Sequence, residues 1–355
     1  MKLIAKCLLL LLPALALGAP VFAGPAGLAD PGQPGMVIIY PKFVNTPRVN
    51  VDGILVPRTE IEIGAICPPA FVAAGGVCAP HQSATVRFQW VCPGAEGVNS
   101  NICVESGFQV TLTVTGKLAF AADGIPINSN SPAVPAAPCP RGYLIGTATS
   151  DQPNFDGLIG NAVIRGPNLT AGPNAGSSTA VSAYQAITIQ AGTTFAGVQV
   201  GDVKFDKMAP GAPLPDVLSE TVLIFLTLDV RPNQPNSPTS LDLDFYNESA
   251  GDPSANTNFE KRLSTFWEFV CWGQAQLSTI NSNLTQALMG TRKGIVIAGP
   301  AQKVRDGNAP GDPPGPVTLI GLVETIEGTA ANGFQERKYN FNMYNDGTAV
   351  TTGGL

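Results

Sequence analysis

Apolar and polar residues alternate with a period of two in several short segments of the chain. Isoleucines alternate with glutamates in Thr59–Ile66, and apolar residues alternate with polar ones in Ala84–Cys92 and Phe108–Thr115. This period places one kind of side chain on each face of an extended strand, whereas helical spacing fits none of these segments. The pattern therefore predicts half-buried antiparallel strands.

Further segments, rich in β-branched and aromatic residues and bounded by turn residues, predict more strands. They are Met36–Tyr40, Tyr143–Thr149, Leu158–Arg165, Val181–Gln190, Glu220–Val230, Thr265–Leu277, Gly294–Ala298, Val317–Ile326 and Tyr339–Tyr344. Val222–Leu226 is apolar at every position, which predicts a central strand covered on both faces. One short helix is expected, with Ser282 as its cap, Leu284 and Leu288 four residues apart, and Gly290 as its end.

The composition supports an all-β fold. The 39 glycines and 32 prolines argue against extensive helix, and an apolar fraction of 44% is sufficient for a core. About a dozen strands fit a large antiparallel β-sandwich, or two sandwiches packed together. The Pro/Gly-rich stretches between strands are expected to be long surface loops on one body, 36–355, whose best internal boundary lies near 205–218.

The first residues resemble a secretory signal peptide. Lys2 and Lys6 precede the apolar run Leu8–Leu17, and the small residues that follow predict cleavage after Ala23. Residues 1–23 are therefore expected to be removed, and 24–35 to form a flexible leader. This places the protein in the periplasm or outside a bacterial cell, with no transmembrane segment once the signal is removed.

Six cysteines follow the predicted cleavage point, and an even number in an exported chain predicts disulfides. Cys67 and Cys78 enclose a short segment rich in Gly, Pro and small residues, as do Cys92 and Cys103. The spacing predicts Cys67–Cys78 and Cys92–Cys103 as clamps across loops, which leaves Cys139–Cys271 as a long-range bond. A thiolate metal site is not favoured, because no CxxC pair is present.

Several functional classes lack their characteristic residues. The formal net charge of −6 argues against a nucleic-acid-binding protein, because such proteins need a cluster of basic side chains to contact the phosphates. His81 is the only histidine, so every histidine-dependent nucleophile would need it, and its position after Cys78 indicates an exposed loop. The sequence also lacks GxSxG, GxxxxGK[ST], SxxK and HExxH motifs.

One acidic segment offers ligands for a hard cation. Asp242 and Asp244 project to the same side if the segment is extended, and Glu248 follows closely. Carboxylate oxygens of this kind bind Ca²⁺, although the spacing does not match an EF-hand loop. The plainer interpretation is a solvated strand face that runs into a turn. No other cofactor is indicated.

A polysaccharide-cleaving enzyme is the second functional hypothesis, because it needs only two carboxylates across a cleft. The candidate acids are Glu60, Glu62, Glu268, Glu324 and Glu327. Aromatic residues for a sugar-binding platform are Phe88, Trp90, Trp267, Phe269 and Trp272, although aromatics at alternating strand positions more often belong to a core.

The sequence thus predicts an exported, disulfide-stabilised β-sandwich protein without catalytic machinery. We expect a structural, adhesive or ligand-binding role at the cell exterior or in the periplasm, with a protein or glycan surface as its partner. The alternative is the carboxylate-based, calcium-dependent enzyme acting on polysaccharide.

Overall fold

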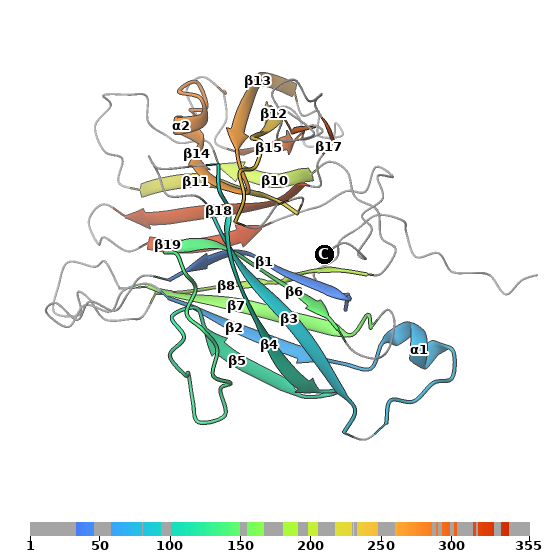
Figure 1. The fold of residues 1–355 in the computed structure, drawn as a ribbon. Coiled ribbons are helices and arrows are strands. Elements are labelled where there is room, and N and C mark those ends of the chain that lie inside the picture. Colours follow the sequence, from blue (N-terminus) through green and yellow to red (C-terminus); the bar gives the residue numbers. More distant parts are fainter. Residues whose placement is uncertain are drawn as a thin grey trace, which may run out of the picture.

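The computed structural model describes a chain that is almost entirely β. The described residues are 33–45, 58–79, 81–93, 101–149, 155–166, 180–190, 198–204, 217–228, 230, 233–247, 260–285, 289, 293–298, 302–303, 315–316, 319–329 and 335–340. Every strand pair among them is antiparallel, and they form four sheets (Figure 1). The predicted signal peptide and most of the leader lie outside these residues.

The N-terminal half of the chain forms the first two sheets. The first sheet has the order β5-β2-β7-β8, with β2 Arg58–Ala65, β5 Lys117–Ala121, β7 Leu158–Gly166 and β8 Ala180–Gln185. The second sheet has the order β4-β3-β6-β1-β9, with β1 Val37–Val44, β3 Ser83–Cys92, β4 Val104–Thr113, β6 Arg141–Ala148 and β9 Ile187–Ile189.

The C-terminal half forms the other two sheets. The third sheet has the order β14-β11-β18-β19, with β11 Val217–Thr227, β14 Trp272–Gln276, β18 Leu319–Thr329 and β19 Gln335–Asn340. The fourth has the order β10-β15-β12-β16-β17, with β13 also paired to β12. Its strands are β10 Val198–Lys204, β12 Thr239–Asn247, β13 Glu260–Phe269, β15 Lys293–Ala298, β16 Gln302–Lys303 and β17 Gly315–Pro316.

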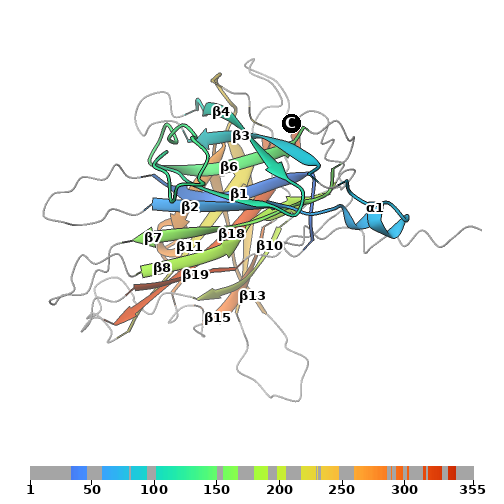
Figure 2. The same ribbon diagram turned by 90° about the horizontal axis from the view of Figure 1, so that it is seen from below.

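The four sheets pack in succession, with three hydrophobic cores between them. Ile38 and Tyr40 of β1 face the first core, between the first and second sheets, while Val37 and Ile39 face the second core. On β11, Val222, Ile224 and Leu226 face the second core, and Leu223 and Phe225 face the third core, against β12. The inner two sheets are thus buried on both faces, as the uninterrupted apolar run Val222–Leu226 predicts. Figures 1 and 2 show the sheets from two directions.

The two halves meet at the second core through polar contacts as well as apolar ones. Tyr143 Oη donates a hydrogen bond to Thr227 O over 3.1 Å, and Trp272 Nε1 donates one to Pro41 O over 2.8 Å. Residues on β1–β9 form the first two sheets and residues on β10–β19 the last two, so the change falls between Ile189 and Val198. The boundary expected near 205–218 lies mostly outside the described residues and stays a prediction.

Two of the three expected disulfides are wrong, and the faces of the second sheet explain why. The structure joins Cys67 to Cys78, as their spacing predicts. Cys92, however, bonds to Cys139 and Cys103 bonds to Cys271, so the expected Cys92–Cys103 and Cys139–Cys271 pairs are absent.

Cys92 pairs in register with Val104 across the β3–β4 ladder, so the neighbouring Cys103 points to the opposite face. Cys92 accordingly belongs to the first core and Cys103 to the second. Cys139 packs on the first core and Cys271 in the second. Each cysteine bonds to the partner on its own side of the sheet.

One smaller expectation changes. Gln33–Gly35, placed in the flexible leader, are bonded to the sheets: the Gly35 amide donates to Leu158 O over 3.0 Å, and Thr188 Oγ1 donates to Gln33 O. The expected short helix lies partly outside the described residues: Ser282 and Asn283 form a turn, and Met289 is helical, with its amide donating to Thr285 O over 2.9 Å. Two further short helices are α1, Pro69–Ala73, and α2, Leu277–Ile280. No helix in the described residues is long and apolar enough to cross a bilayer.

Candidate functional site

A corner in the chain brings two tryptophans to one cavity. Strand β13 ends at Phe269 in the fourth sheet, and β14 begins at Trp272 in the third sheet, so Val270 and Cys271 form a bend between sheets. The disulfide from Cys271 to Cys103 ties this bend to the N-terminal half. Side chains on both arms of the bend therefore face the same space.

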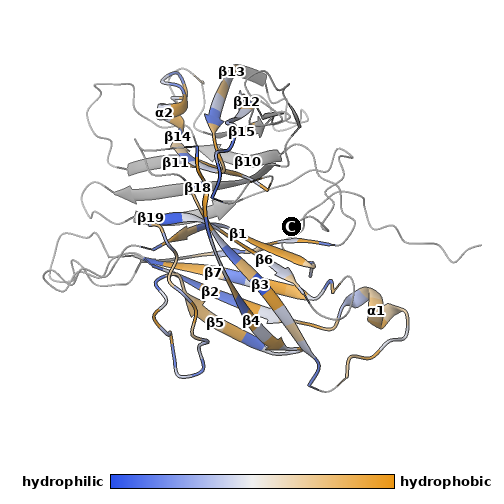
Figure 3. Ribbon diagram, in the orientation of Figure 1, coloured by the Kyte–Doolittle hydropathy of each residue, from blue (hydrophilic) through white to orange (hydrophobic). Residues whose placement is uncertain are grey.

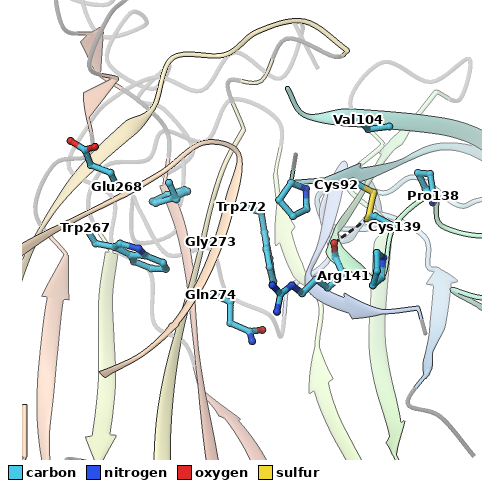
Figure 4. A pocket seen from close by; sticks show the side chains of 13 residues that line it. Cys92, Val104, Pro138, Cys139, Arg141, Trp267, Glu268, Trp272, Gly273 and Gln274 are labelled. Atoms are coloured by element: carbon cyan, nitrogen blue, oxygen red, sulfur yellow. Dashed lines mark hydrogen bonds between the residues drawn. A yellow bond between two sulfur atoms is a disulfide. The ribbon is translucent and has the colours of Figure 1, made fainter. Parts of the chain in front are cut away.

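This space is a groove of about 660 Å³ between the bend and the end of the second sheet. Its far wall contains the Cys92–Cys139 disulfide and the start of β6 (Figure 4). The residues that line the groove are Cys92, Pro93, Val104, Pro138, Cys139, Pro140, Arg141, Trp267, Glu268, Phe269, Trp272, Gly273 and Gln274. Its size is within the range of pockets that hold small ligands.

Packing fixes the two tryptophan rings. The half-buried Trp267 lies 5.8 Å from Phe225 and 5.5 Å from Phe269 between ring centroids. A side chain at Gly273 would place its Cβ 2.9 Å from Trp267 Cζ2, so only glycine allows the ring this position. Trp272 is buried and held by its bond to Pro41 O. The aromatic part of the groove is therefore preorganised.

The charged side chains of the groove differ in direction. In Figure 4 the guanidinium of the exposed Arg141 extends toward Trp272 and Gln274, whereas the carboxylate of Glu268 points away from the disulfide wall. Cys139 Sγ lies 3.0 Å from Arg141 O, a close contact only, because a disulfide sulfur carries no hydrogen. The groove thus combines aromatic rings with the donors of Arg141 and the donor–acceptor amide of Gln274.

The predicted calcium ligands lie elsewhere, on β12. The alternation on β12 buries Leu241 and Leu243 and leaves Asp242 exposed and Asp244 half-buried on the outer face, as expected from the sequence. Ser264 Oγ donates a hydrogen bond to Asp244 Oδ1 over 2.7 Å. Glu248 lies outside the described residues. Within the described part of the chain, no group of three or more His, Cys, Asp or Glu side chains could hold a metal ion.

The candidate catalytic acids whose side chains the structure describes do not share one cleft. Glu60 forms ion pairs with Arg58 and Arg165, each over 2.7 Å, and Glu62 pairs with Lys117 over 2.7 Å. These acids lie on the first sheet. Glu324 is buried on β18, and Glu268 lies at the groove, while the side chain of Glu327 is outside the described part.

The candidate aromatic residues lie either in the first core or at the groove, and the candidate histidine lies in a turn. Phe88 and Trp90 belong to the first core, where they pack against Phe108 and Phe120. The exposed His81 lies in a turn after Cys78, with a φ of 66°. Sequence reasoning identified the groove's aromatic residues but missed Arg141 and Gln274. Arg141 gave no signal because its place at the groove depends on the pairing of β6 with β1 and on the packing of the two halves.

No protein-family model matches this chain, and no curated protein matches its sequence. Any function assigned to the protein therefore rests on its own residues.

Proposed function

We propose that the protein is an exported, disulfide-stabilised binding protein that holds a carbohydrate chain in the groove. Export is inferred from the signal-like N-terminus, and it agrees with three disulfides, which persist in oxidising compartments. A layered β body with a preorganised groove suits a role at the cell exterior or in the periplasm.

The fixed ring of Trp267 at the groove carries this proposal. The apolar face of a sugar ring packs on an indole, and such a ring loses little entropy on binding when its neighbours already hold it. Sugar hydroxyls both donate and accept hydrogen bonds, which matches the guanidinium of Arg141 and the amide of Gln274. Gln274 Oε1 is buried and has no hydrogen-bond partner among the described residues, so a purely apolar ligand would leave this oxygen unpaired.

The alternative of a polysaccharide-cleaving enzyme receives less support. Such an enzyme needs two carboxylates that face each other roughly 5–10 Å apart. Among the described residues that line the groove, Glu268 is the only carboxylate, and it points away from the disulfide wall. The groove therefore favours binding over cleavage.

The test is a screen of the purified protein against an array of neutral and uronic-acid-containing oligosaccharides, followed by calorimetric titration of the best ligand. Trp267→Ala should weaken that affinity by at least about tenfold. Phe266→Ala is the matched control, because Phe266 precedes Trp267 on β13 but is 67% exposed and does not line the groove. This control should bind as the unchanged protein does.

Because Trp267 also packs on two phenylalanines, Arg141→Gln provides a second variant that leaves this packing intact. It should weaken binding too, whereas Arg165→Gln, on the first sheet, should not. Binding that survives both groove variants would place the carbohydrate elsewhere. Cleavage of the bound oligosaccharide would favour the enzyme instead.

A further inference from the structure

The loop closed by the Cys67–Cys78 disulfide, here called the clamped loop, gathers exposed apolar side chains. Phe71 is 43% exposed, Val72 51% and Val77 85%. Six large apolar side chains are exposed in the described part of the chain, and half of them belong to this one loop. Such clustering marks an interaction surface, since exposed apolar residues are ordinarily scattered.

The clamped loop contains no polar side chain at all. From Cys67 to Pro80 the sequence has only Cys, Pro, Ala, Phe, Val and Gly, in a chain whose charged fraction is 13%. Figures 1 and 2 show α1, which is part of this loop, projecting beyond the ends of the strands, and Figure 3 shows the loop mostly in hydrophobic colours. An apolar tip therefore extends away from the body of the protein.

The backbone of the clamped loop also suits an apolar environment, where each unpaired amide is costly. The amides of Val72, Ala74, Gly75 and Gly76 donate to carbonyls within the loop, and Pro68 and Pro69 have no amide hydrogen. The disulfide joins the two ends over a Cα–Cα distance of 5.8 Å and holds the loop in this shape.

The size and shape of the tip indicate what it contacts. A stable protein–protein interface buries roughly 800 Å² on each partner and combines an apolar centre with a polar rim. A tip with three large apolar side chains and no polar one lacks such a rim. Insertion of a few apolar side chains into a bilayer needs neither a matching surface nor a rim.

We propose that the clamped loop inserts into the interfacial region of a lipid bilayer and holds the protein reversibly at a membrane surface. Because the loop is uncharged and the protein carries a net charge of −6, the attraction is apolar rather than electrostatic. Binding should therefore occur on zwitterionic lipid and should not weaken with salt.

The experiment is co-sedimentation of the chain without residues 1–23 with sucrose-loaded vesicles of phosphatidylcholine, with or without phosphatidylglycerol, in 0.1 M and 0.5 M NaCl. We expect binding to pure phosphatidylcholine at both salt concentrations, and no stronger binding to the anionic vesicles. Val77→Asp should lower the partition coefficient by roughly tenfold or more, since Val77 is the most exposed of the three. Phe266→Asp, at an equally apolar exposed site away from the loop, should leave it unchanged.

Three results would overturn the proposal. The first is an absence of binding to either vesicle, and the second is binding only to anionic vesicles that 0.5 M NaCl abolishes. The third is a change in the sedimentation coefficient of the lipid-free protein in Val77→Asp, because the loop would then join two copies of the chain. Sedimentation velocity on both proteins, run without lipid, measures this directly.

Discussion

Lys42 of β1 and Glu324 of β18 form an ion pair between the second and third sheets, with 2.5 Å between Nζ and Oε2. Their side chains are 3% and 1% exposed. Tyr184 of β8 lies beside them and donates its hydroxyl hydrogen to Lys42 O, and burial raises the pKa of Tyr184 well above its ordinary value. This polar cluster lies where three sheets meet and joins the two halves of the chain.

Removing one member of this ion pair should be far more damaging than removing both. Lys42→Met or Glu324→Leu alone leaves the other charged side chain buried without the opposite charge of the pair and should destabilise the fold by about 3–5 kcal/mol. The double variant Lys42→Met/Glu324→Leu replaces the pair by apolar groups and should lie within about 2 kcal/mol of the unchanged protein. Urea unfolding of all four proteins measures the coupling. Additive single effects would show that the pair does not act as a unit.

The Cys103–Cys271 disulfide should contribute more stability than the Cys67–Cys78 clamp. The first joins residues 168 apart and the second residues 11 apart. Loop-closure entropy then gives the long bond about 2 kcal/mol more. Paired Cys→Ala replacements should show this difference in the midpoint of thermal unfolding. Peptide mapping without reduction tests the pairing itself, which would be refuted by a peptide linking Cys92 to Cys103.

Glu105 of β4 should make the fold less stable at neutral pH than in mild acid. Burial raises its pKa from the ordinary 4.5, and the attraction of Arg87 only partly opposes this. An acid with a raised pKa in the folded state favours folding fully below pH 4.5, and this contribution disappears as the pH rises through the raised pKa. A pKa that differs by one unit between the folded and unfolded states changes the free energy of unfolding by about 1.4 kcal/mol. Because Glu105 is half-exposed, solvent screening reduces its contribution to a fraction of that value.

Glu105→Gln should accordingly raise the melting temperature at pH 7 and have little effect at pH 4. Arg87→Gln serves as the opposite control, since it removes the favourable attraction and should lower the melting temperature at pH 7. Equal effects of Glu105→Gln at both pH values would exclude an electrostatic cause.

The alternation of side chains was sufficient to predict many of the strands but not the contacts between them. Val222–Leu226 could be recognised as doubly covered because both of its faces are apolar. Strand β12 was not among the expected strands, although Leu241, Leu243 and Phe245 alternate with polar residues there. Its two aspartates suggested a calcium site, although a solvated strand face was the plainer interpretation of this segment.

The disulfides and the groove depend on which face of which sheet each residue occupies. Cys92 and Cys103 look like a clamp in sequence because they lie close together, but the register of β3 and β4 points them apart. Trp267 and Arg141 lie more than a hundred residues apart, and only the packing of the two halves brings them to one groove. No local pattern encodes such a relationship.

The shared middle core affects how the chain acquires its structure during synthesis. The second sheet is complete once residues up to β9 have been synthesised. One of its faces, which includes Val37, Ile39 and Ile187, is covered only by β11 and β14, which come later in the chain. Until then, a nascent chain exposes the apolar face of this sheet to solvent. The Cys103 thiol also has no Cys271 with which to form its disulfide. The first third of the chain is therefore shielded only when residues from the last third, including Cys271 and Trp272, have been added.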